Sequence, residues 1–271
     1  MRVFAIKEKG IGEKSLLGYL LYYEKAKAFY IELPDNANVW NTPLIISSFV
    51  KRGEYSLNSY WSKRWIQQRI IPSERQNIGQ ILKHHKLSSY DEFSLLWFSK
   101  GRCEQDSYYL TEVKKEAFPS FLSKRWKTKV VDVVPLSNKK LLTIFRNETV
   151  KIIDMKKIIN KYMLCMPYIN REELFNQVEL QPDGYGIQWN PQATIMYYEL
   201  YKMGKTLPLT KDDLRILLEK RLITTAQTCK LLNCTKQNID YLVANKKLNP
   251  IQVDSKHKLF LKNEVLQRKT T

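Results

Sequence analysis

The sequence has little of what metal sites and disulfide scaffolds are built from. Of its 271 residues only 4 are cysteine and 3 are histidine. Cys229 and Cys234 are close together, but no second cysteine or histidine pair follows at zinc-site spacing. His84 and His85 are adjacent and therefore point to different sides of a helix, where they cannot easily chelate one ion. We expect reduced cysteines, no metal and no cofactor.

Long apolar runs are also missing. No stretch approaches the roughly 18 consecutive apolar residues that a membrane-spanning helix needs. The first nine residues alternate like a strand and soon become charged, whereas a signal peptide has an apolar centre. These features predict a cytoplasmic protein with no membrane partner.

The motifs of phosphoryl transfer are absent as well. There is no H-R-D or D-F-G string, and the glycine pairs Gly10/Gly12 and Gly184/Gly186 lack the third glycine of a nucleotide loop. A kinase needs metal-holding carboxylates and a phosphate cradle together. A kinase is therefore not expected.

The remaining enzyme hypothesis is a nuclease. The string from Glu112 to Lys114 has the form E-x-K, with Asp91 and Asp106 upstream. One such string is expected by chance in a chain this rich in lysine. We expect that the protein is not an enzyme and keep the nuclease as a third hypothesis for its function.

Positive charge is abundant and unevenly distributed. The chain has 45 Lys and Arg against 27 Asp and Glu, a formal net charge of +18. Residues 1–135 carry net +8, residues 136–210 net +3, and residues 211–271 net +7 from 13 basic and 6 acidic groups. The shortest segment is the most charge-dense, and neutralisation of nucleic-acid phosphates is expected there.

The same C-terminal segment contains a helix-turn-helix pattern. Two short helical stretches flank Asn233, which stands at a turn position that needs a positive φ. Thr235 can cap the second helix, whose Ile239 and Leu242 return to the core at helical spacing. Two helices in this arrangement are typical of DNA-binding domains, although a helical hairpin used only for packing is the alternative.

Residues 222–265 resemble the excisionase and MerR-like family, with Asn233 where glycine is commonest. The resemblance extends over a tail in which residues 250–260 are expected to form a β-hairpin wing with Asp254 and Ser255 in its turn. It implies a winged helix-turn-helix that binds double-stranded DNA. The candidate DNA-binding residues are Thr235, Lys236, Gln237, Asn238, Tyr241, Lys246, Lys247, Lys256, His257 and Lys258.

Residues 1–113 are expected to form one unit of strands and helices. Strands are predicted over 3–6, 16–23, 28–33 and 108–113, and helices over 44–51, 59–70, 73–83 and 91–98. The stretches 18–33, 69–82 and 90–110 resemble the N-terminal subdomain of the HipA family and its free-standing relative HipS, with Gly101–Asp106 in place of a glycine-rich ending. This resemblance implies a protein partner and a toxin-antitoxin context.

Two further segments precede the C-terminal domain. Residues 114–136 are crowded with lysine and interrupted by Pro119 and Pro135, so we interpret them as a basic linker, or as a segment lying along a phosphate backbone. Residues 137–208 resemble a small prokaryotic domain family of unknown function that often accompanies a helix-turn-helix. The matching residues are Phe145, Asp154, Phe175, Gly186, Trp189, Leu200 and Tyr201.

Together these features predict a multidomain α+β protein: two small α+β units at 1–113 and 137–208, the linker at 114–136, and a winged helix-turn-helix at 209–271. The expected function is sequence-specific binding of double-stranded DNA by a transcriptional regulator of a small operon. The alternative is an antitoxin-like module that restrains a HipA-like kinase. A homo-oligomer is expected, with its dimer contact in residues 1–208, most plausibly in the N-terminal unit.

Overall fold

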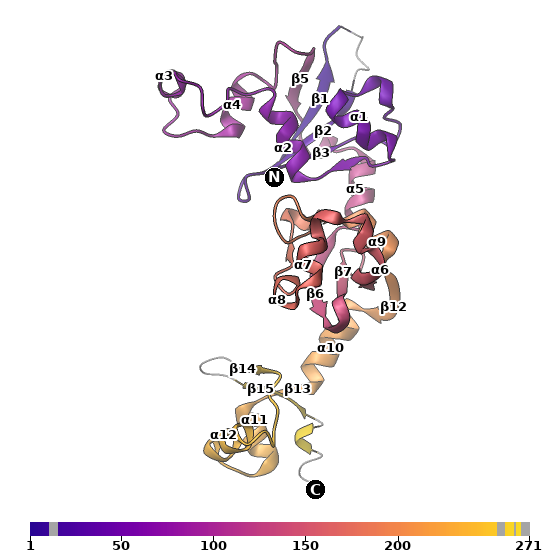
Figure 1. Cartoon of the computed structure of the whole chain (residues 1–271), viewed down its shortest axis with the longest axis vertical. Helices are drawn as coiled ribbons and strands as arrows, with labels where there is room; N and C mark the ends of the chain where they lie inside the picture. The colour runs from indigo at the N-terminus through magenta and orange to yellow at the C-terminus, as the bar shows by residue number, and fades with distance from the viewer. Residues whose placement is uncertain (11–15, 254–257, 263, 267–271) are drawn as a thin grey trace. The chain divides into compact units, whose positions relative to one another are not determined.

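The computed structural model describes residues 1–10, 16–253, 258–262 and 264–266, and it divides into two compact units (Figure 1). The first is Met1–Leu207 and the second Pro208–Thr271. Both contain helices and antiparallel strands, so the expected α+β class is confirmed. No helix of the described ranges is both long enough and apolar enough to cross a membrane.

The first unit begins with a five-stranded antiparallel sheet in the order β4-β3-β2-β1-β5. Its strands are apolar at consecutive positions, and all five residues of β3 are buried, because both faces of the sheet are covered. The strands are β1 (Arg2–Glu8), β2 (Leu16–Tyr23), β3 (Ala28–Glu32), β4 (Ser56–Leu57) and β5 (Tyr108–Glu112).

One face of this sheet packs against helices. Ile46 of α1, Trp65 of α2 and Leu96 of α4 join Phe4 and Ile6 in a single core. The elements here are η1 (Val39–Asn41), α1 (Leu44–Lys51), α2 (Ser59–Gln67), α3 (Ile78–His84) and α4 (Glu92–Phe98). The helix expected over residues 73–83 begins only at Ile78, because a turn follows Pro72.

The opposite face of the five-stranded sheet packs into a second hydrophobic core. Leu21 and Tyr30 of the first sheet pack there with residues such as Phe145, Tyr185 and Leu200. This core is built on two more antiparallel sheets, in the orders β12-β8-β7-β6 and β11-β10-β9. Residues 1–113 and 137–208 therefore form one compact unit and not the two separate units expected, because the first sheet has a second apolar face that must be covered.

The strands of these sheets are β6 (Val130–Leu136), β7 (Lys140–Phe145), β8 (Thr149–Asp154), β9 (Glu179–Leu180), β10 (Gly186–Gln188), β11 (Thr194–Met196) and β12 (Lys205–Thr210). The helices are α5 (Ser120–Trp126), α6 (Met155–Ile158), α7 (Met166–Asn170), α8 (Glu172–Phe175) and α9 (Tyr197–Met203). The 3-10 turns are η2 (Lys115–Ala117), η3 (Ser137–Lys139), η4 (Ile159–Lys161), η5 (Met163–Cys165) and η6 (Pro182–Gly184). Strands β7 and β8 form an antiparallel hairpin, and Leu180 of β9 pairs with Ile187 of β10.

The expected linker at residues 114–136 is a part of the folded unit. It contains α5 and the edge strand β6, whose Val134 pairs with Leu142 of β7. Pro135 is tolerated because β6 lies at the edge of its sheet, where one side of a strand needs no N–H donor. The two glycines of the Gly184/Gly186 pair serve packing, since a Cβ on Gly184 would lie 1.9 Å from the carbonyl oxygen of Val130.

Among its described residues, the second unit contains the helices α10, α11 and α12, further helical residues at 262 and 264–266, and a small sheet in the order β13-β15-β14. Its core contains Ile223, Ile239, Leu248, Phe260 and Val265. The elements are α10 (Lys211–Arg221), β13 (Leu222–Thr224), α11 (Thr225–Leu232), α12 (Lys236–Ala244), β14 (Gln252–Val253) and β15 (Lys258–Leu261).

Candidate nucleic-acid interface

The turn between α11 and α12 is set by three local signals. Thr224 starts α11 with a capping box, exchanging hydrogen bonds with Gln227. Asn233 ends it at φ 50°, in the left-handed conformation, and the N–H of Cys234 bonds to the carbonyl of Cys229 at 3.0 Å. Thr235 then caps α12 by accepting the N–H of Asn238. The predictions for Asn233 and Thr235 are thus confirmed.

The inner face of α12 fixes the helix against the rest of the unit. Ile239 is fully buried beside Phe260 of β15, and Leu242 packs against the same core. Cys229 and Cys234 are free thiols that also contact this core, in agreement with their interpretation as small packing residues. The inner face of α12 is therefore held by apolar contacts.

The outer face of α12 is exposed and polar. Gln237 and Tyr241 are four residues apart and so lie on one face, opposite Ile239. Asn238 and Lys236 flank them, and the Tyr241 side chain is 59% exposed. The structure thus brings four of the candidate residues together on one helical surface, and Thr235 lies at its end.

The N-terminal end of α12 favours an anion. The first turn contains no acidic residue and does contain Lys236. The unpaired N–H groups of a helix N-terminus carry partial positive charge, which attracts phosphate. After the helix ends, the chain reaches Lys246 and Lys247, which are both exposed. Candidate DNA-binding lysines therefore lie at both ends of the exposed polar face of α12.

The hairpin that follows is partly described. Gln252 pairs with Leu259 and Val253 with Lys258, as the wing prediction requires. Lys256 and His257, like the predicted turn residues Asp254 and Ser255, lie outside the described residues. Lys258 is not oriented toward solvent alone: its ammonium forms an ion pair with Asp240 of α12. This pair cannot be predicted from the sequence, because nothing local links two residues 18 positions apart.

The residues of the nuclease hypothesis do not converge. Glu112 pairs with Arg2 at 2.9 Å, whereas Asp106 pairs with a different partner, the buried side chain of Arg69. Within the described residues, no three or more His, Cys, Asp or Glu side chains form a group that could hold a metal ion. The geometry therefore gives the nuclease hypothesis no support.

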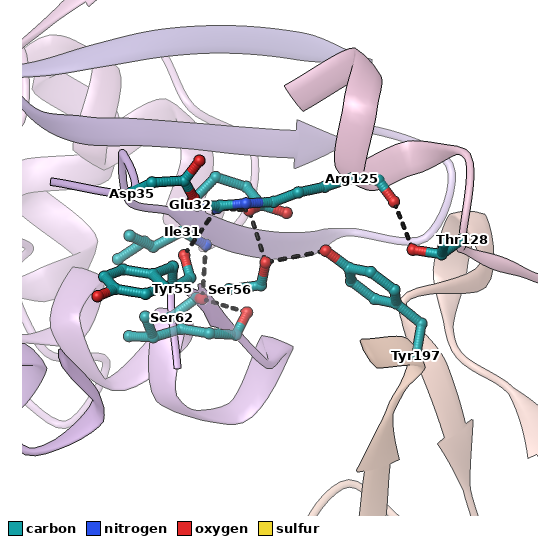
Figure 2. A network of polar contacts seen from close by, with 10 residues as sticks. Ile31, Glu32, Asp35, Tyr55, Ser56, Ser62, Arg125, Thr128 and Tyr197 are labelled. Atoms are coloured by element: carbon teal, nitrogen blue, oxygen red, sulfur yellow. Dashed lines mark hydrogen bonds and ion pairs between the residues drawn. The ribbon is translucent and has the colours of Figure 1, made fainter. Parts of the chain in front are cut away.

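A buried network of charged and hydroxyl groups lies inside the first unit (Figure 2). Glu32 is completely buried at the end of β3, where it accepts hydrogen bonds from Ser56 at 2.6 Å and from Arg125 of α5 at 2.9 Å. Arg125 also pairs with Asp35. The Tyr197 hydroxyl of α9 reaches Ser56 at 3.1 Å. The network links the first sheet to α5 and α9.

A second buried charge lies nearby in the chain. Lys129 has a completely buried side chain, and its ammonium donates to Asp183 at 2.7 Å and lies 3.6 Å from the centroid of the Tyr185 ring. Burial lowers the pKa of Lys129 to about 8, although the neighbouring Asp183 acts in the opposite direction. Glu32 and Lys129, the central charged groups of the two networks, are completely buried, so we assign both networks a structural role.

No protein-family model, no curated protein and no solved structure matches this chain.

Proposed function

We propose that the second unit is a winged helix-turn-helix that binds double-stranded DNA at specific sequences, and that the protein regulates transcription of a small operon. The observation that carries the proposal is the exposed polar face of α12, which presents Lys236, Gln237 and Asn238 at the positive end of a helix held by a packed core. Such a helix fits the major groove of B-DNA.

Each candidate residue has a role that its chemistry suits. Gln237 and Asn238 can form paired hydrogen bonds with adenine, and Lys236 can donate to guanine or to phosphate. Thr235, Lys246 and Lys247 lie where they can hold phosphates on either side of the groove. The 13 basic and 6 acidic groups of residues 211–271 supply the attraction that does not depend on sequence.

The test is selection of bound DNA from a random duplex library by the full-length protein, at a stated salt concentration. We expect one enriched motif, and stronger binding to it than to random duplex by a factor of about 10³ or more. Equal binding of all duplexes, or no binding near physiological salt, would contradict the proposal.

The second candidate function is an antitoxin-like module that restrains a HipA-like kinase. It is favoured by apolar side chains that the first unit exposes: Trp40 is 94% and Leu44 is 90% exposed. Exposed aromatic residues are enriched in protein interfaces. The test is to purify the kinase-like protein encoded beside this gene, if there is one, and to measure its activity with the parent chain and with Trp40→Ala. Inhibition that Trp40→Ala abolishes would favour this function.

A further inference from the structure

Lys258 stands where the hairpin of the second unit meets both of its packed helices. Its ammonium pairs with Asp240 of α12, and its carbonyl oxygen accepts a hydrogen bond from the Thr225 hydroxyl of α11 at 3.4 Å. Two residues further along β15, Phe260 is completely buried in the core. β15 is thus held by the buried Phe260 side chain and, at its first residue, by the ion pair of Lys258.

We propose that Lys258 is a positioning residue: its ion pair with Asp240 fixes the hairpin relative to the DNA-reading helix, and its charge is not used to neutralise a DNA phosphate. This inference rests on the proposed function. It changes the role expected for Lys258 from the sequence, which was that of a cation directed at DNA.

The hairpin needs such a constraint because it is small. β14 has only two residues and forms two register pairs with β15. β15 is paired with β13 on its other side, so β14 is the edge strand of this small sheet. Asp240 immediately precedes Tyr241 on α12, so the ion pair connects the hairpin to the helix that carries the candidate readers.

Charge balance points the same way. An unpaired Asp240 would repel phosphates close to the polar face of α12, and pairing with Lys258 removes that repulsion. The hydrogen bond from Lys258 lowers the pKa of the Asp240 carboxyl, which favours the carboxylate form. The pair carries no net charge, and we therefore expect no counterion release from it when DNA binds.

The experiment measures affinity for the selected DNA site as a function of salt in full-length variants. The neutral double variant Asp240→Asn/Lys258→Gln removes the ion pair. The swap, a double variant Asp240→Lys/Lys258→Asp, exchanges its two charges. Both variants keep the net charge of the parent. We expect the neutral variant to bind the selected site roughly three- to ten-fold more weakly, with an unchanged slope of log affinity against log salt. We expect the swap to restore most of that loss.

Two single variants make the test sharper. The matched control Lys236→Ala, on the exposed start of α12, should lower the salt slope by about 0.9 if its charge faces phosphate. Asp240→Asn alone should weaken binding to the selected site, because the hairpin loses its constraint. If Lys258 instead contacts phosphate, Asp240→Asn would free it and strengthen binding.

A neutral double variant whose salt slope falls by about one unit overturns the inference, as does an Asp240→Asn variant that binds more tightly. A swap that leaves the loss unrestored also overturns it. These outcomes are distinct from failure of the proposed function, which would show itself earlier, as a parent protein that selects no DNA sequence.

Discussion

Single residues on the outer face of α12 carry the sequence preference that we propose. Gln237 and Asn238 are exposed and have amide groups that match the edge of adenine. Replacing either one by Ala should cost roughly 1–3 kcal/mol of binding free energy at the selected site and relax the preference at one base pair. Gln177→Ala, an exposed glutamine of the first unit, is the matched control and should change nothing. If both variants bind the selected site as the parent does, α12 is not the reader.

The buried Lys129 leads to a prediction of how the stability of the protein depends on pH. Its pKa is about 8 in the folded protein and 10.5 in its ordinary state, so between these values the unfolded chain binds more protons than the folded one. The free energy of unfolding should therefore rise as pH increases from about 8, by at most roughly 1.4 kcal/mol per pH unit from this group. Below pH 8 both states are protonated and the contribution is constant.

Other groups oppose this rise at higher pH. Burial raises the pKa of Cys165 to about 12, so stability from that thiol is lost above about pH 9. The measurement is therefore a difference: unfolding by denaturant at pH 7.5, 8.5 and 9.5 for the parent and for Lys129→Met. We expect the rise only in the parent. Parallel curves of unfolding free energy against pH would show that the pKa of Lys129 is not lowered in the folded state.

At the scale of elements, local sequence signals were enough to predict the structure where a single residue determines the backbone conformation. Asn233 and Thr235 predict the end of α11 and the start of α12, because a left-handed turn and a helix cap each depend on a single side chain. β6 could not be predicted this way. Apart from Val130 its residues are exposed or half-buried, and they follow a lysine-rich stretch; their pairing with β7 places them in the sheet.

The ion pairs of Asp240 with Lys258 and of Glu32 with Arg125 were missed for a related reason. Each joins residues far apart in sequence, and each involves a charged residue that composition assigns to the surface. A charge is buried only when a partner is supplied by tertiary structure. In consequence the outward positions of α12 could be predicted from helical spacing, whereas the ion pair of Lys258 with Asp240 could not.

Asn233 provides a test of the turn itself. Because its φ is 50°, Asn233→Ala should lower the free energy of unfolding by about 1 kcal/mol, whereas Asn233→Gly should be neutral or slightly stabilising. Asn245→Ala, at a negative φ after α12, is the control for loss of an asparagine side chain. Denaturant unfolding of the second unit would measure all three. An Ala variant as stable as the Gly variant would contradict the left-handed turn.

For the first unit as a whole, the network in Figure 2 joins segments that the sequence suggests are separate domains. Arg125→Ala would leave the buried Glu32 carboxylate without its cation, which should cost about 3–5 kcal/mol of stability. The exposed partner offers a matched control: Asp35 is 74% exposed, and Asp35→Ala should cost less than about 1 kcal/mol. Equal effects of the two variants would show that the buried pair does not stabilise the unit.

The assembly of the whole molecule gives the last prediction. Two-fold DNA sites are commonly bound by dimers, and we propose that the contact between copies lies in the first unit, which is compact by itself and exposes Trp40 and Leu44. A competing surface exists in the second unit, because α10 exposes Leu217 and Leu218 by more than half. The chain ending at Thr210 lacks α10 and distinguishes the two.

We expect this truncated protein to be folded, to sediment as an oligomer at micromolar concentration, and to have lost binding to the selected site. If it is a monomer while the full-length protein is a dimer, the contact lies in residues 211–271, where α10 is the exposed apolar helix. If it still binds the selected site, recognition does not belong to α12, and the basic segment around α5 becomes the surface to test, because it exposes Lys124 and Lys127 beside an aromatic side chain, Phe121.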